Sequence, residues 1–222
     1  MLVTGLPFLE EEPKLECLNH YDQYIPCNRD FACSTKLEEY AHHDHLAPYR
    51  VSHSHIFHNF ITDFQMECAT PYHIGLIGSS YFLGFMLGSI IFAPLADIIG
   101  RKRVIMLGAA MFFFTMLFML FVANTVNGLY LGMFLIGFRT SANSQIVYVM
   151  ITEYTDMKSR VYFCIFCNVL ESVMNLFNGF YYTVGGHYKV LYYFGAILSF
   201  ILVIWTYLWI PESPRYLKTK DN

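Results

Sequence analysis

The chain has 222 residues and a formal net charge of −3, from 14 Lys and Arg against 17 Asp and Glu. Hydrophobic residues make up 55% of it and aromatic residues 18%, which is too apolar for an ordinary soluble domain. The composition therefore indicates a membrane protein. The net charge says little about it, because orientation in a membrane follows the placement of Lys and Arg.

The N-terminal part of the chain differs from the rest, because from Glu10 to about His73 it is polar and aromatic and has no run of spanning length. We expect residues 1–73 to be an extracellular or lumenal Cys/His-rich loop region that follows a truncated first helix. Four cysteines in this segment predict two disulfides, with all three possible pairings left open. The four are Cys17, Cys27, Cys33 and Cys68.

Histidine is concentrated in the same region. Six of the histidines lie between Ala41 and Phe60, namely His42, His43, His45, His53, His55 and His58. Zinc could bind His-x-His pairs beside Asp44, but no spacing matches a closed zinc site, and imidazoles in an exposed loop are usually solvated. We therefore expect no metal site, and no residue pattern predicts a cofactor.

Five long apolar runs follow, each about 20 residues long, which is enough to cross about 30 Å of hydrocarbon. The runs are Ile74–Ala96, Val104–Ala123, Leu129–Ile151, Val161–Val184 and Val190–Ile210. We expect a transmembrane helical bundle over residues 74–210 and a cytoplasmic tail over residues 211–222. Lys and Arg concentrate in alternate connections, which places the loop at Arg101, the loop at Lys158 and the C-terminus in the cytoplasm.

Two ionisable residues, Arg139 and Glu171, lie near the middle of the third and fourth runs, where such groups normally face the bundle interior or water. Their depths are similar, so we expect an ion pair beside the substrate path. Polar residues recur at helical spacing on both runs, and either a solute cavity or hydrogen bonds between helices would explain them. The candidate substrate-binding residues are Gln145, Tyr148, Asn168, Glu171 and Asn175.

Small residues have a different meaning in these runs. Ser80, Gly84 and Gly88 recur at steps of four in the first run, a spacing that allows close packing against another helix, and we expect a scaffold role for them. Cys164 and Cys167 in the fourth run are expected to be small packing residues rather than a redox or metal site.

The segment "SSYFLGFMLGSIIFAPLADIIGRKR" resembles the second transmembrane helix and following loop of the major facilitator superfamily, whose motif is G-x-x-x-D-[RK]-x-G-[RK]-[RK]. The matching positions are Asp97, Gly100, Arg101 and Lys102. Ala93 and Ile98 stand where the motif has Gly and a cation. The chain thus keeps four of the six defined positions of the motif.

Two further segments resemble signatures of the same superfamily. "TEYTDMKSR" is similar to the E-x6-R signature after helix four, through Glu153 and Arg160. "PESPRYL", which contains Glu212 and Arg215, resembles the P-E-S-P-R signature that closes helix six in the sugar and organic-ion branches. With the Cys-rich outer loop, these motifs make the chain similar to the N-terminal half of the organic cation transporter group.

The resemblance implies an all-α membrane protein, the N-terminal half of a major-facilitator-type bundle with about five transmembrane helices. Members of the superfamily use the motif charges to hold the inner gate shut. The residues that the resemblance and the intramembrane charges assign to gating are Asp97, Gly100, Arg101, Lys102, Arg139, Glu153, Arg160, Glu212 and Arg215.

The implied function is transport of small organic solutes, organic cation, organic ion or sugar-like, by alternating access in a membrane, more consistent with the plasma membrane than with an organelle. The implied partners are the solute, the lipid bilayer and a missing C-terminal half or partner subunit. The alternative is a non-transporting structural membrane subunit or a truncated relic of a transporter. We expect no enzyme, because no catalytic triad or phosphate loop is present, and no nucleic-acid binding, because the basic cluster lies too near the membrane.

Overall fold

The computed structural model describes residues 9–10, 13–18, 23–33, 49–52, 59–209 and 211. The chain divides into two compact units, one formed by Met1–Ile74 with Asn175–Tyr188 and the other by Gly75–Met174 with Lys189–Asn222. The six clustered histidines, His42, His43, His45, His53, His55 and His58, and the candidate gating residues Glu212 and Arg215 lie outside the described residues.

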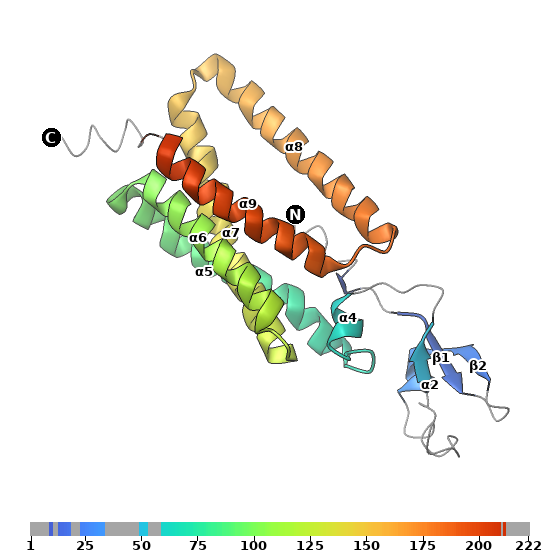
Figure 1. The fold of residues 1–222 in the computed structure, drawn as a ribbon. Coiled ribbons are helices and arrows are strands. Elements are labelled where there is room, and N and C mark those ends of the chain that lie inside the picture. The colour runs from blue at the N-terminus through green and yellow to red at the C-terminus, as the bar shows by residue number, and fades with distance from the viewer. Residues whose placement is uncertain are drawn as a thin grey trace. The chain divides into compact units, whose positions relative to one another are not determined.

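Five long helices follow the five apolar runs among the described residues (Figure 1). They are α5 (Pro71–Ile99), α6 (Arg101–Phe121), α7 (Val126–Tyr154), α8 (Met157–Thr183) and α9 (Tyr188–Trp209). In a bilayer a helix satisfies every backbone hydrogen bond within the segment, so long apolar sequence favours this structure. The expected all-α membrane bundle is confirmed.

Four of these helices, α5, α6, α8 and α9, have both the length and the apolar composition needed to cross a membrane, among the residues that the structure describes. The fifth expected span, α7, is long enough at 29 residues but is less apolar, because Arg139 and several hydroxyl and amide side chains interrupt it. Buried residues run along α7 from Leu129 to Met150, so neighbouring helices cover much of its surface. The protein is a multi-pass integral membrane protein.

α5 and α7 pack with their backbones almost in contact. A Cβ atom on Gly84 would meet the carbonyl oxygen of Phe134, and one on Gly137 would meet the carbonyl oxygen of Tyr81. Gly88 also faces α7, at the carbonyl of the next turn. Such contacts need small residues, so the scaffold role expected for Gly84 and Gly88 is confirmed.

A compact apolar cluster joins the ends of α5 and α7 to the start of α6. Its buried members are Phe92, Ala96, Val104, Ile105, Ala142, Ile146 and Met150. Burial of these side chains fixes the three helix ends relative to one another, and the charged residues described below lie on those ends.

In the first unit, the N-terminal region forms a small antiparallel sheet in the order β2-β1-β3, which the sequence did not reveal. The strands are β1 (Leu15–Leu18), β2 (Tyr24–Cys27) and β3 (Tyr49–Val51). A short helix, α2 (Arg29–Ala32), lies between β2 and β3 in the sequence. Leu15 pairs with Cys27 on one side and with Val51 on the other. Buried Leu15, Cys17 and Ala32 form the core of this lobe.

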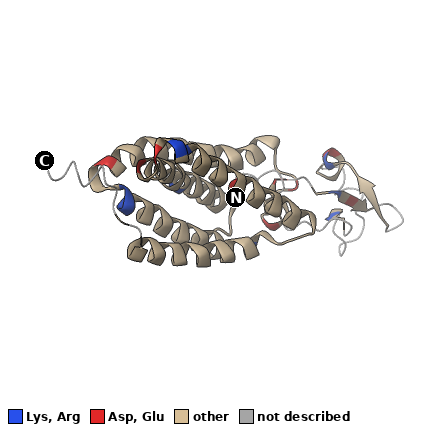
Figure 2. Cartoon of the chain, turned by 90° about the horizontal axis from the view of Figure 1, so that it is seen from above, with Lys and Arg blue, Asp and Glu red and all other residues tan. Residues whose placement is uncertain are grey.

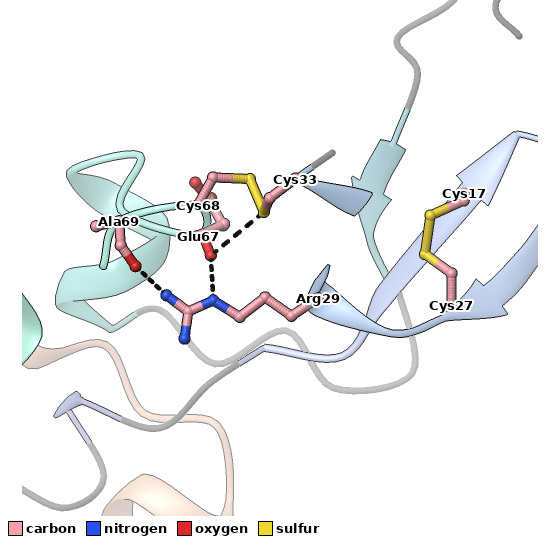
Figure 3. Close-up of a disulfide and its surroundings, with 7 residues drawn as sticks. All are labelled: Cys17, Cys27, Arg29, Cys33, Glu67, Cys68 and Ala69. Atoms are coloured by element: carbon pink, nitrogen blue, oxygen red, sulfur yellow. Dashed lines mark hydrogen bonds between the residues drawn. A yellow bond between two sulfur atoms is a disulfide. The ribbon is translucent and has the colours of Figure 1, made fainter. Parts of the chain in front are cut away.

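Two disulfides stabilise the lobe, and they confirm the two that the cysteine count predicts. Cys17 bonds to Cys27 across β1 and β2, and Cys33, at the end of α2, bonds to Cys68 (Figure 3). Beside the second disulfide, Arg29 Nε donates to the Glu67 carbonyl at 2.9 Å, and its Nη2 donates to the Ala69 carbonyl. The sheet is thereby cross-linked to the segment that leads into α5.

A short helix, α4 (Phe60–Asp63), precedes α5 in the same unit. Asn59 caps it, with its side chain accepting from the Thr62 amide at 3.0 Å. The Tyr188 hydroxyl donates to Asp63 Oδ2 at 2.8 Å, and the buried Phe60 ring meets Tyr188 edge-on with centroids 5.1 Å apart. These contacts join α4 to Tyr188, the first residue of α9.

Candidate functional site

The candidate site is a charged cluster made of Asp97, Arg101, Lys102, Glu153 and Arg160 at one end of the helices. Figure 2 shows charged residues gathered at one end of these helices, whereas most of the helix length is uncharged. The cluster combines residues from the end of α5, the start of α6, the end of α7 and the start of α8.

Gly100 creates the geometry of the cluster, because it is the single residue between α5 and α6. It is buried and has φ of 101° and ψ of 146°, a backbone conformation that is accessible almost only to glycine. The sharp turn leaves Asp97 Oδ1 3.5 Å from Arg101 Nη2. A glycine is therefore required at this motif position by backbone conformation.

Arg101 has two carboxylate partners in unequal environments. Its Nη1 pairs with Glu153 Oε2 on α7, and the two side chains are only 11% and 13% exposed. Asp97 is 73% exposed, so water screens its longer contact with Arg101. Loss of the pair with Glu153 should therefore cost more free energy than loss of the contact with Asp97, since removal of either member of the buried pair would leave the other charge buried.

Two further cations of the cluster bind the C-terminal ends of helices. Lys102 Nζ donates to the Tyr207 carbonyl near the end of α9 at 3.1 Å. Arg160 Nη2 donates to the Thr152 carbonyl near the end of α7 at 2.6 Å. Cations are favourable there, because free carbonyls give helix C-termini a partial negative charge. Arg160 thus binds backbone next to Glu153.

The P-E-S-P-R signature enters the described part of the chain only at Pro211. The Pro211 carbonyl accepts a long hydrogen bond of 3.4 Å from the Tyr154 hydroxyl at the end of α7. This contact brings the start of the signature to the same helix end as Glu153.

The ion pair expected between Arg139 and Glu171 is not formed in the described part of the chain. The Glu171 side chain is exposed, and the Arg139 guanidinium carbon lies 3.6 Å from the centroid of the Phe112 ring on α6. The two residues have similar depths along their helices, but depth does not determine which way a side chain points around the helix axis. Sequence reasoning missed Phe112, because one aromatic residue in an apolar run has no distinguishing signal.

The candidate substrate-binding residues lie on α7 and α8 with differing exposure. Gln145, Asn168 and Glu171 are exposed, whereas Tyr148 and Asn175 are partly buried. Asn168 Nδ2 donates to the Cys164 carbonyl of its own helix at 2.7 Å. A solute role for these residues stays a prediction.

Comparison with known proteins connects this geometry to a family. The family model described as sugar (and other) transporter matches residues 25–222. Solute carrier family 22 member 15-like of Xenopus laevis is 24% identical over 210 residues, which cover 89% of this chain and 38% of that protein. Solute carrier family 22 member 2 of Homo sapiens is 27% identical over 170 residues, which cover 74% of this chain and 29% of that protein.

A plant relative is similar to the same extent. Organic cation/carnitine transporter 6 of Arabidopsis thaliana is 25% identical over 160 residues, which cover 71% of this chain and 30% of that protein. The chain therefore spans well under half the length of the curated relatives it matches. With a family model that covers most of its length, and with the motif residues built into one charged cluster, the chain belongs to the sugar (and other) transporter family of the major facilitator superfamily.

Proposed function

We propose that the chain is part of a carrier that moves small organic solutes across a membrane by alternating access. The observation that carries the proposal is the buried ion pair between Arg101 and Glu153, placed where α5, α6 and α7 meet. Family membership supports transport as the activity and argues against an enzymatic one.

The physics of a buried ion pair suits a gate. Its Coulomb attraction and the cost of desolvating its two charges nearly cancel, so the pair adds little net stability. When a gate opens, water enters and hydrates both charges, which makes opening inexpensive. When it closes, each charge requires the other, so only the correctly matched arrangement is stable. The cluster would therefore define a closed state without holding it permanently.

Orientation follows from the placement of cations and cysteines. The cations of the charged cluster favour the cytoplasmic side, by the positive-inside bias. The two disulfides of the sheet lobe favour the opposite, oxidising side. We place the carrier in the plasma membrane, with the lobe outside the cell.

The proposed solutes are small organic cations and carnitine, the classes in the printed name of the Arabidopsis relative. Because the chain spans 38% of the Xenopus relative, we propose that further helices complete the solute site. These helices belong either to a C-terminal half or to a partner subunit.

A chimaera tests the proposal. The chain replaces the matching segment of the Arabidopsis organic cation/carnitine transporter, and the chimaera is reconstituted into liposomes. Saturable uptake of radiolabelled carnitine is expected, and Arg101→Met should reduce it strongly while Asp97→Asn, at the exposed partner, should reduce it less. A folded, correctly inserted chimaera without saturable uptake would overturn the proposal and favour a structural membrane subunit.

A further inference from the structure

We propose that Arg139 binds the carboxylate of an anionic or zwitterionic organic solute, in a seam between α6 and α7 formed by Gly108, Phe112, Arg139 and Asn143. The inference rests on the proposed function and narrows its substrate class from organic solutes in general to solutes that carry a carboxylate. Four steps support it.

The first step is the unused bonding capacity of Arg139. Its guanidinium lies over the Phe112 ring, and its Nε is buried. Arg139 makes no hydrogen bond or ion pair with any residue that the structure describes. Stacking on a ring occupies one face of the guanidinium plane but leaves the N–H groups at its edge available. A carboxylate can accept two of those N–H groups side by side.

The second step is that the stacking ring is itself held in place. A Cβ atom on Gly195 of α9 would lie 3.5 Å from Cζ of the Phe112 ring, so α9 packs against the tip of that ring. Phe112 therefore contacts α9 at its edge and the Arg139 guanidinium over one face. Because the ring is supported, the Arg139 side chain is already ordered before a ligand binds. Binding would therefore cost less side-chain conformational entropy.

The third step is a second unsatisfied polar group one helical turn away. Asn143 Oδ1 is buried without a hydrogen-bond partner in the described part of the chain. It fills the space that Gly108 leaves open, since a Cβ atom on Gly108 would meet that oxygen. Residues four apart share a helix face, so Asn143 and Arg139 both face α6. The α7 face toward α6 thus combines an anion-binding donor with an unsatisfied side-chain oxygen.

The fourth step is electrostatic. Ionisable groups inside a membrane are expensive and normally have a partner. The Glu171 carboxylate on α8, which lies at a similar depth along its helix, is exposed and forms no ion pair with Arg139 among the described residues. A solute carboxylate would supply the missing charge. The competing arrangement is a state in which Glu171 itself moves to Arg139, since the two residues lie at similar depths along their helices.

Thermal unfolding of the purified chain in detergent tests the inference without requiring transport. The probes are carnitine, benzoate, tetraethylammonium and sodium chloride. Carnitine and benzoate should raise the Tm of the wild-type chain, whereas tetraethylammonium should not. Arg139→Met should remove the effect, with apparent affinity for carnitine lowered at least about tenfold, because a charge-assisted pair is lost. Arg139→Lys should keep a weakened effect.

The outcomes separate the possible explanations. Arg139→Met should still fold, because it replaces an unpaired charge with a hydrocarbon of similar length, and without ligand it should melt no lower than the wild-type chain. Equal stabilisation of Arg139→Met by carnitine, or no stabilisation of the wild-type chain, would overturn the inference. Equal stabilisation by chloride would reassign the seam to an inorganic anion.

Glu171→Gln and uptake complete the test. If the Glu171 carboxylate pairs with Arg139 in solution, Glu171→Gln should increase the rise in Tm that carnitine causes. If Glu171→Gln abolishes that rise, Arg139 is not the carboxylate site. Carnitine could stabilise the chain through Arg139 while the chimaera shows no uptake. That result would refute the proposed transport and would still support Arg139 as a carboxylate-binding residue.

Discussion

Arg101 and Glu153 provide the sharpest prediction about stability. Arg101→Met would leave the Glu153 carboxylate, 13% exposed, without its guanidinium partner. Breaking a buried pair from one side costs about 3–5 kcal/mol. Glu153→Leu should cost somewhat less than Arg101→Met, because Arg101 keeps its longer, solvent-screened contact with Asp97. The double variant should recover most of that loss, because neither charge remains.

The assay is equilibrium unfolding of the purified chain in mixed detergent micelles, with the free energy of unfolding measured for the four members of this double-mutant cycle. Asp97→Asn serves as the matched control, because this second carboxylate partner of Arg101 is 73% exposed. It should cost less than about 1 kcal/mol. Losses that simply add in the double variant would refute the coupling between Arg101 and Glu153.

Three further predictions concern backbone, packing and orientation. Gly100→Ala should cost about 1–3 kcal/mol in unfolding free energy, because φ of 101° strains any residue with a Cβ atom, whereas Gly75→Ala, in open space, should cost nothing. Gly137→Val should lower the Tm of the chain by forcing α7 away from α5; an unchanged Tm would contradict the close approach. A cysteine at Ser159, with both native free cysteines replaced by serine, should be labelled by an impermeant maleimide only in inverted vesicles or permeabilised cells. Labelling in intact cells would reverse the proposed orientation.

The helices could be predicted from the sequence because hydrophobic length alone determines a membrane span. The first run was expected at Ile74–Ala96, and the helix is Pro71–Ile99. The ends differ by three residues because polar and charged residues continue a helix into the interface without adding to its apolar run. The sequence predicted a charged loop between Ala96 and Val104, whereas the structure reduces this connection to the single residue Gly100.

The parts that could not be predicted depend on contacts between distant segments. Strands of three and four residues, such as Tyr49–Val51, are too short for an alternating pattern to be recognised. The cysteine pairing likewise requires a spatial neighbour, and only the fold brings Cys33 to Cys68. For Arg139, similar depth suggested Glu171, but the rotation of the helices turned the guanidinium toward Phe112.

Alternating access is the central claim, and counterflow tests it most directly. Liposomes that contain the chimaera are preloaded with unlabelled carnitine, and the initial rate of labelled carnitine uptake is measured from a lower external concentration. A carrier should take up label faster into preloaded vesicles, with a transient overshoot, because each outward step with bound solute returns the site to the outer face. Arg101→Met should weaken this stimulation. Uptake that is saturable but unaffected or slowed by preloading would contradict alternating access.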